Sequence, residues 1–572
     1  MLVHRLSASR RSPGTAERGL PRKHGDPLHP RRAANLWRIR HGPLLRIGSV
    51  TGSVENGGGS VAAVRAAVTG CADRPAIITR HAELDWGGTL ESAARIAGAL
   101  RSLGVGRGDR VAILAANDGL YVQLYLAIPW IGAVLTPLNC RWSVAENAFA
   151  LADCRPALMI VGEGFEQAAQ DAIARSGLSL PVVSSGALRP EWVPASEFSG
   201  HAPVPPEQVD GDALWGIFYT GGTTGRAKGV MLSGANVAGN SQTVRTLGVF
   251  PDGCRALIVA PLFHLAGASA LMSTMLAGGA AVVAPGFHPA ETPRLIADKG
   301  VTDAFLVPAM IRMVLDDPGF DPGLLSGVQR ILYGASPMSE ALLDRITAAA
   351  PHAQFYQAYG MTETSAAATL LTPEMHRGEN RRTGKHRSAG RAIPGTEVRV
   401  ADPAGRPVAA GDVGEILVRG PGVMLGYWEQ PETTAAVLAD GWMHTGDGGY
   451  LDEGGSLFVV DRMKDMIVSG GENVYSAEVE AVLDSHPAVA QCAVIAVPDA
   501  RWGERVHAVV VFHPDTDAGE DELGAHCRNS IAAYKCPKSF EFVPALPLSA
   551  AGKVLKAELR ARHWAGQSSN VS

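Results

Sequence analysis

Hydrophobic and polar positions follow an alternating pattern along most of the chain. From about residue 60, a stretch with helical periodicity at 89–103 is followed by a short apolar run at 110–114, with the glycine-containing turn 106–109 between them. This alternation is typical of an α/β fold in which helices cover parallel sheets. Further apolar runs occur at 151–161, 256–260, 280–284 and 329–333.

The pattern changes after about residue 390. Short strands separated by glycine are expected at 396–400, 414–419 and 455–460, which predicts a β-rich subdomain. A final unit contains a predicted helix at 477–485, strands at 489–496 and 508–512, and a helix near 521–533. We therefore predict an α/β fold: a large N-terminal domain of stacked α/β subdomains plus the β-rich part, and a small mobile α+β C-terminal domain. The predicted boundaries are 59–462 for the large domain, 463–565 for the small domain and 566–572 for a tail.

Charge is distributed unevenly. The chain has 572 residues and a net charge of −5, but its first fifty residues hold eleven Lys and Arg against only Glu17 and Asp26. The remaining acidic body argues against nucleic-acid binding, which needs clustered positive charge. Residues 1–58 are rich in Arg, Pro, Gly and Ser and are predicted to be a disordered basic extension. An arginine-rich transit peptide is the alternative, although the segment lacks the apolar core of a secretory signal.

The cysteines and the apolar stretches indicate in which cellular compartment the protein resides. Seven scattered cysteines without a CxxC pair indicate a reducing environment. No apolar stretch approaches the roughly 20 residues that a transmembrane helix needs. We expect a cytoplasmic protein without a transmembrane segment. Its oligomeric state is open, with a homodimer as the common case.

The strongest local motif is YTGGTTGRAKG at 219–229, which directly follows a predicted strand. Its glycines allow the backbone to approach an anion, its threonines add hydroxyl donors, and Lys228 adds a cation. Arg226 and Ala227 separate Gly225 from Lys228, so the motif differs from a Walker A loop. The sequence predicts a polyphosphate site here, with a simple tight turn as the alternative.

Several ordered blocks carry a family resemblance over roughly residues 60–562. They are YTGGTTGRAKG at 219, PLFHLAG at 261, YGASPMS at 333, YQAYGMTET at 356, GEILVRGPGVMLGYW at 414, GWMHTGDGGY at 441, DRMKDMIVSGGENVYSAEVE at 461, YKCPK at 534 and GKVLK at 552. In these blocks the chain resembles the adenylate-forming superfamily of acyl-CoA synthetases, peptide-synthetase adenylation domains and firefly-type luciferases. The resemblance implies an enzyme, an AMP-forming acid–thiol ligase that uses ATP, Mg²⁺ and CoA.

The same resemblance implies the nucleotide site. It assigns the β- and γ-phosphates to the Gly/Thr loop, the α-phosphate to Thr362, and Mg²⁺ to Glu363, with a helix cap as the alternative role for Glu363. Tyr359 would stack on adenine, and Asp447 with Arg462 would bind the ribose. The implied ATP and AMP residues are Thr220, Gly221, Gly222, Thr223, Thr224, Gly225, Lys228, Gly334, Ala335, Ser336, Gln357, Tyr359, Gly360, Thr362, Asp447 and Arg462.

The C-terminal blocks imply the movable parts of the catalytic machinery. Lys553 matches the family's catalytic lysine, which bridges the carboxylate and the α-phosphate, and Lys464 matches the hinge of the small domain. Gly470, Gly471 and Glu472 would face the thiol of CoA. The chain departs from the family at Gly221, where a serine is usual, and at Ala551, which precedes the Gly-Lys pair.

The acid and its acceptor are less well defined by the sequence. The predicted acyl pocket is apolar with small residues, and His264 is the one basic residue in it, so we expect a fatty or aryl monocarboxylate rather than malonate. The predicted pocket residues are His264, Tyr333, Ala358 and Met361, with Ala309, Gly334, Ala335 and Gly360 beside them. An acyl carrier protein as acceptor and a catalytically weakened ligand-binding protein are the alternatives. Seventeen histidines without HExxH or paired Cys/His spacing indicate no zinc site.

Overall fold

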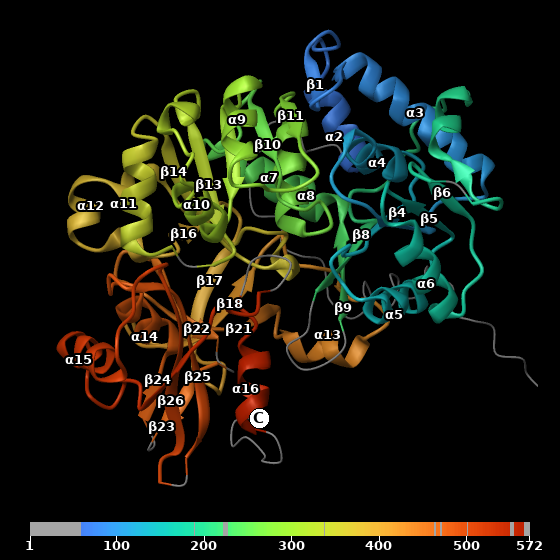
Figure 1. Ribbon diagram of the computed structural model, residues 1–572. Helices are drawn as coiled ribbons and strands as arrows, with labels where there is room; N and C mark the ends of the chain where they lie inside the picture. The colour runs from blue at the N-terminus through green and yellow to red at the C-terminus, as the bar shows by residue number, and fades with distance from the viewer. Residues whose placement is uncertain are drawn as a thin grey trace, which may run out of the picture. The chain divides into compact units, whose positions relative to one another are not determined.

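A computed structural model describes residues 59–187, 189–220, 227–336, 338–462, 465–469, 472–499, 501–548 and 554–564. These residues form four sheets, two of which are large and mainly parallel (Figure 1). Helices connect most of the consecutive parallel strands, as the alternating pattern predicted. The predicted fold class is confirmed.

The first large sheet has the strand order β19-β9-β8-β4-β3-β5-β6-β7. The strands from β8 to β7 in this order are parallel, and the edge is completed by antiparallel β9 and β19. The strands are β3 (Arg110–Leu114), β4 (Val134–Pro137), β5 (Leu158–Val161), β6 (Val182–Ser184), β7 (Val193–Pro194), β8 (Leu214–Thr220), β9 (Lys228–Ser233) and β19 (Gly426–Tyr427). The helices in this part are α3 (Trp86–Ser102), α4 (Gly119–Trp130), α5 (Val144–Cys154), α6 (Glu166–Ser176) and the 3₁₀ turn η1 (Ala195–Gly200).

The second large sheet has the order β16-β15-β14-β13-β12-β10-β11-β1-β2. Its strands are β1 (Pro75–Ile78), β2 (Glu83–Asp85), β10 (Arg255–Ile258), β11 (Ala280–Val283), β12 (Asp303–Leu306), β13 (Arg330–Gly334), β14 (Gln354–Tyr359), β15 (Thr369–Leu371) and β16 (Arg391–Ala392). Its helices are α2 (Ser60–Ala67), α7 (Gly234–Thr246), α8 (Leu265–Leu276), α9 (Glu291–Asp298), α10 (Pro308–Leu315), α11 (Glu340–Ala349) and α12 (Gly378–Arg382). The 3₁₀ turns are η2 (Pro322–Leu325), η3 (Thr362–Thr364), η4 (Pro373–His376) and η5 (Lys385–Arg387).

Both large sheets are buried on both faces, which explains why their strands read as unbroken apolar runs. In β3, Val111 and Ile113 belong to the largest core cluster, whereas Ala112 and Leu114 belong to the cluster on the opposite face. Successive side chains of a strand point to opposite faces, so this division is the expected one. The largest cluster joins one face of each large sheet to α3, α4, α7 and α8, which places these helices between the two sheets.

The β-rich part is a mainly antiparallel sheet of β17 (Glu397–Ala401), β18 (Gly414–Arg419), β20 (Leu438–Ala439), β21 (Trp442–Leu451) and β22 (Leu457–Arg462), with α13 (Pro431–Val437) beside it. The strands predicted at 396–400, 414–419 and 455–460 correspond to β17, β18 and β22. Strand β21 was missed because three glycines interrupt its apolar pattern. This sheet carries Asp447 on β21 opposite Arg462 on β22.

The C-terminal sheet is built on the long antiparallel pair β25 (Val489–Asp499) and β26 (Gly503–Phe512). β23 (Ile467–Ser469), β24 (Glu472–Val474) and parallel β27 (Ser539–Phe542) extend it, and α14 (Ser476–Leu483), α15 (Glu520–Ser530) and α16 (Lys556–Trp564) cover it. Val494 and Ala496 face the core formed with α14 and α15, whereas Ile495 and Val497 face the core that contains Leu559 of α16. The helix α16 therefore packs on the opposite face of the sheet from α14 and α15.

None of the described helices has the length and apolar composition needed to span a bilayer.

Candidate active site

A buried carboxylate lies where the two large sheets end. Glu363 in η3 is 5% exposed, and its Oε1 accepts a hydrogen bond from the hydroxyl of Tyr427 at 2.9 Å. The Nζ atom of Lys228 lies 5.0 Å from the centre of the same tyrosine ring. Burial raises the pKa of Glu363, while the Tyr427 hydroxyl and the charges of Arg462 and Lys228 oppose that rise. The site therefore contains a buried carboxylate on which two positive charges act, those of Arg462 and Lys228.

Backbone pairing explains how Tyr427 and Lys228 meet. Strand β19 joins the first large sheet beside β9, with Tyr427 opposite Val230, and the N–H of Trp428 donates to the carbonyl of Gly229 at 2.7 Å. Lys228 begins β9 and pairs with Thr220 at the end of β8. The predicted phosphate motif is therefore the connection of a β-hairpin. Gly221–Gly225 lie outside the described residues.

A second polar group contains the residues that the family resemblance assigned to adenine and ribose. The hydroxyl of Tyr359 donates to Oδ2 of Asp447 at 2.8 Å, and Nε of Arg462 lies 3.4 Å from Oδ1. Burial, followed by the charge of Asp447, raises the pKa of Tyr359 well above its usual value. Tyr359, Asp447 and Arg462 come from β14, β21 and β22, and the structure brings their side chains together; their roles toward adenine and ribose stay predictions.

The backbone between these groups is crowded and locally unusual. A Cβ on Gly334 would lie 2.5 Å from the carbonyl oxygen of Ala358 on the neighbouring strand, and one on Gly360 would lie 2.4 Å from the carbonyl oxygen of Ala366. Ala335 has a φ of +68°, and Ser365 and Ala366 have φ values of +58° and +85°. Left-handed conformations at non-glycine residues cluster at functional sites. Ser336 and Gln357 are partly buried beside this backbone.

Two asparagines that were not among the predicted site residues donate hydrogen bonds to backbone carbonyls of the loops around residues 367 and 421–423. Asn236 Nδ2 donates to the carbonyls of Pro421 at 2.6 Å and Val423 at 3.1 Å, and Asn240 Nδ2 donates to that of Ala367 at 2.7 Å. Both lie on α7, which directly follows the phosphate hairpin. The available signal was the capping box of Ser233 and Asn236 at the start of α7.

The predicted acyl-pocket residues do not all share one face of the second sheet. Ala358 and Met361 pack against the largest core cluster, and His264 is the N-cap of α8 with its ring centre 4.6 Å from that of Phe263. Tyr333 instead belongs to the cluster on the opposite face, where its hydroxyl lies 2.9 Å from Nε2 of His376. Its place in an acyl pocket stays a prediction.

Several predicted residues cannot be placed. Lys553, Lys464, Gly470 and Gly471 lie outside the described residues, and for Glu472 only the backbone, in β24, is described.

Known proteins match the chain over most of its length. The model of the AMP-binding enzyme family matches residues 64–428, and that of the AMP-binding enzyme C-terminal domain matches residues 478–553. The chain belongs to the AMP-binding enzyme family. All the polar groups described above, except Asp447 and Arg462, fall within the first matched range.

Individual relatives agree with this assignment. A feruloyl-CoA synthase from Amycolatopsis sp is 41% identical over 476 residues, which cover 82% of this chain and 92% of that protein. The fatty acid–[acyl-carrier-protein] ligase ScoC from Streptomyces coeruleorubidus is 35% identical over 502 residues, covering 87% and 95%. The crystal structure of ATP-bound MatB from Rhodopseudomonas palustris is 30% identical with a TM-score of 0.80, covering 88% of this AMP-binding enzyme and 98% of that chain.

Proposed function

We propose that this protein is an AMP-forming acyl-CoA synthetase that activates an aryl monocarboxylate with ATP and transfers the acyl group to coenzyme A. The observation that supports this most is the convergence of Glu363, Lys228 and Arg462 beside the hairpin that carries the phosphate motif. Membership of the AMP-binding enzyme family supplies the reaction class.

The nucleotide would be held from three sides. The hairpin loop with Thr220 and Lys228 would bind the phosphates through backbone N–H groups, hydroxyls and one ammonium group. The crowded backbone at Gly334, Ala335 and Gly360 would form a wall for adenine. Asp447 keeps lone pairs for ribose hydroxyls because Tyr359 and Arg462 occupy only part of its hydrogen-bonding capacity.

Glu363 fits the magnesium ion that the family implies. Its carboxylate supplies the hard oxygen ligand that Mg²⁺ prefers, and one protein carboxylate together with substrate phosphates is a common way to hold this ion. When bound there, Mg²⁺ would neutralise charge on the phosphate oxygens. Tyr427 would keep the carboxylate oriented through the bond to Oε1.

The chemistry then needs two displacements. A carboxylate oxygen of the acid attacks the α-phosphorus and pyrophosphate leaves, so that an acyl-adenylate forms. In the second step the sulfur of CoA attacks the acyl carbon and AMP leaves with the bonding electrons. Lys228 and Lys553 would stabilise negative oxygens in the first step. Gly470–Glu472 would approach the CoA thiol in the second, after rotation about Lys464.

Protein thiols are poor candidates for an acyl intermediate. Burial raises the pKa of Cys154 and of Cys254 to about 12, and that of Cys527 to about 11. A thiol with a raised pKa supplies little of the thiolate that acts as nucleophile. Direct attack by the CoA sulfur accounts for the transfer without an enzyme cysteine.

The aryl acid is proposed from the relative named as a feruloyl-CoA synthase and from the apolar character of Ala358 and Met361. A second candidate acceptor is an acyl carrier protein, because another relative is named as a ligase for that acceptor.

The test uses purified full-length protein with ATP, Mg²⁺, CoA and a panel containing ferulate, simple aryl acids and fatty acids of several lengths. AMP and acyl-CoA are followed by mass spectrometry. We expect feruloyl-CoA or a related aryl-CoA from the wild type. In Lys553→Ala we expect adenylation about 10²-fold slower, as for loss of a transition-state charge contact. Lys538→Ala, which removes an exposed lysine of the same domain, is the matched control.

Other outcomes are also decisive. If the protein formed the adenylate but no acyl-CoA, and then loaded an added carrier protein, the acceptor would be the acyl carrier protein and not CoA. Fatty acyl-CoA in place of aryl-CoA would overturn the aryl assignment while keeping the reaction. ATP binding without AMP formation for every acid would contradict the enzyme proposal.

A further inference from the structure

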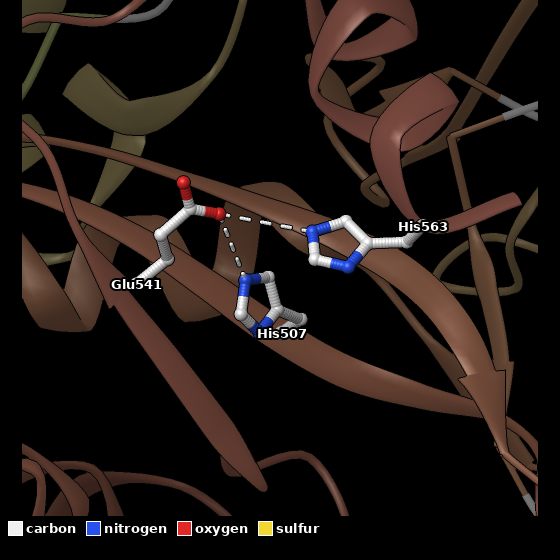
Figure 2. A group of neighbouring side chains, drawn as sticks. All are labelled: His507, Glu541 and His563. Atoms are coloured by element: carbon white, nitrogen blue, oxygen red, sulfur yellow. Dashed lines mark ion pairs between the residues drawn. The ribbon is translucent and has the colours of Figure 1, made fainter. Parts of the chain in front are cut away.

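Two histidines and a glutamate of the C-terminal sheet point toward one another (Figure 2). His507 lies on β26, Glu541 on the adjacent strand β27, and His563 near the end of α16. Residue 507 shares its face of β26 with Val509, which belongs to the core that also contains Leu559 of α16. Strand alternation and helix packing therefore bring the three side chains to one point, far from Glu363 in the sequence.

The distances within this group are too long for direct hydrogen bonds. Nε2 of His507 lies 3.8 Å from Oε2 of Glu541, and Nε2 of His563 lies 3.7 Å from the same oxygen. Both Nε2 atoms are buried, and neither has a hydrogen-bond partner among the described residues. One potential ligand atom from each residue lies within 4.8 Å of the other two. A small contraction would bring all three atoms to the spacing of ligands around one cation.

The ring of His507 is oriented for this role by a neighbour. Its Nδ1 lies 2.7 Å from Oγ of Ser539, which is its register partner on β27. When Nδ1 carries the proton and donates to Oγ, the lone pair of Nε2 points at Glu541 and His563. Such an outer hydrogen bond is typical of metal-binding histidines, because it selects the tautomer and the ring orientation.

The surroundings of His507 favour its neutral imidazole, which is the ligating form. Burial, and then the neighbouring His563, lower the pKa of His507. Arginine lies on the other side of the carboxylate, with NH1 of Arg562 at 3.5 Å from Oε1 of Glu541, which leaves Oε2 for the histidines. The side chains of Glu541 and His563 are 33% and 29% exposed, so water can reach a fourth coordination position.

We propose that His507, Glu541 and His563 form a binding site for a divalent transition-metal ion, with zinc as the expected occupant. Two imidazoles and one carboxylate, with one open position for water, are a ligand set that suits zinc. Spacing along the sequence did not indicate this site, since its ligands come from three separate elements.

The expected role of the ion is structural. It would tie α16 to β26 and β27, and α16 directly follows the segment that contains Lys553. An ion that binds the folded chain and not the unfolded chain stabilises the fold by mass action. The site therefore links metal content to the stability of the domain that carries the predicted catalytic lysine.

The test starts from full-length protein stripped of metal with a chelator and then titrated with Zn²⁺ against a chromophoric chelator. We expect the wild type to bind one more equivalent of zinc than the double variant His507→Gln/His563→Gln. Glu541→Gln, which keeps the side-chain shape, should weaken binding at least tenfold, since even outer-shell changes cost that much. The matched control is His526→Gln, because His526 also lies beside a histidine in this domain but contributes no ligand.

Thermal unfolding gives a second readout that needs no enzymatic activity. Zinc should raise the Tm of the wild type and of His526→Gln by at least about 2 °C, raise that of Glu541→Gln by less, and leave that of the double variant His507→Gln/His563→Gln unchanged. Equal zinc stoichiometry in the wild type and the double variant would overturn the proposal. So would a Tm of the wild type that is insensitive to zinc, because the cluster would then act only as a group of ion pairs.

Discussion

Glu363 and Glu541 offer an instructive contrast between the two matched domains. Glu363 is buried, its Oε1 accepts a hydrogen bond from Tyr427, and the charges of Lys228 and Arg462 act on it. Glu541 is one-third exposed and faces the unpartnered Nε2 atoms of two histidines. The first would supply a single oxygen ligand, whereas the second would complete a set of three protein ligands.

Ligand number and type separate the ions that these carboxylates suit. A lone carboxylate needs substrate phosphates and water to complete a magnesium shell, so that ion would arrive with ATP. Three protein ligands of nitrogen and oxygen can hold zinc without substrate. Under the two proposals, ligand number therefore separates a carboxylate that would act in the reaction from one that would stabilise the fold.

The largest expected effect comes from Glu363→Gln, which keeps the shape of the side chain and removes its charge. We expect ATP/pyrophosphate exchange to fall about 10²- to 10³-fold, since the charged oxygen would act on the transferring phosphates. Exchange is measured with saturating acid and Mg²⁺. Glu432→Gln, an exposed residue at the start of α13, should keep wild-type exchange. If Glu363→Gln kept more than a third of the wild-type exchange activity, the charge of Glu363 would not be needed for adenylation, and the proposed difference in role between Glu363 and Glu541 would be wrong.

His376 can be compared with His507 and His563, because each of its two ring nitrogens has a hydrogen-bonding partner. His376 lies between the Tyr333 hydroxyl and the Thr372 carbonyl, and burial lowers its pKa from 6.5 to about 4. A lowered folded-state pKa gives stability that is present above pH 6.5 and is lost as the pH falls toward 4. The loss amounts to at most about 3 kcal/mol over this window.

His376→Gln should therefore flatten the acid dependence of the unfolding free energy. Urea unfolding followed by tryptophan fluorescence at pH 7 and pH 5 measures it. At pH 7 the variant should be less stable by about 1–3 kcal/mol, through the hydrogen bond lost to Tyr333. If the unfolding free energy changed by the same amount between pH 7 and pH 5 in the variant and in the wild type, protonation of His376 would not be coupled to folding. Zinc should not change the difference in unfolding free energy between the wild type and His376→Gln.

The smallest effect is expected for Tyr427→Phe, which removes only the hydroxyl bonded to Glu363. That hydrogen bond lowers the pKa of Glu363, so its loss favours the protonated carboxyl and shifts the acidic limb of the adenylation profile to higher pH. We expect exchange at pH 6 to be about fivefold slower than in the wild type, with little change at pH 8. A uniform loss at all pH values would indicate that Tyr427 acts only in packing.

The sequence by itself determined the fold class and most of the nucleotide-site candidates. The block around Lys228 indicates phosphate binding through its own residues, whereas the roles of Tyr359, Glu363 and Asp447 were implied by the family resemblance that their contiguous blocks carry. The apolar runs predicted the buried strands for the same local reason, because parallel strands covered on both faces need unbroken hydrophobic residues. The run at 151–161 was less informative, since it contains the end of α5 and the whole of β5.

Only the tertiary structure decided which distant residues meet. Asn236 and Asn240 support the site through carbonyls more than a hundred residues away, and Tyr427 reaches Glu363 because β19 joins β9. His507 and His563 face Glu541 because alternate residues of β26 share a face with α16. These contacts depend on strand register and helix packing, which leave no fixed spacing in the sequence.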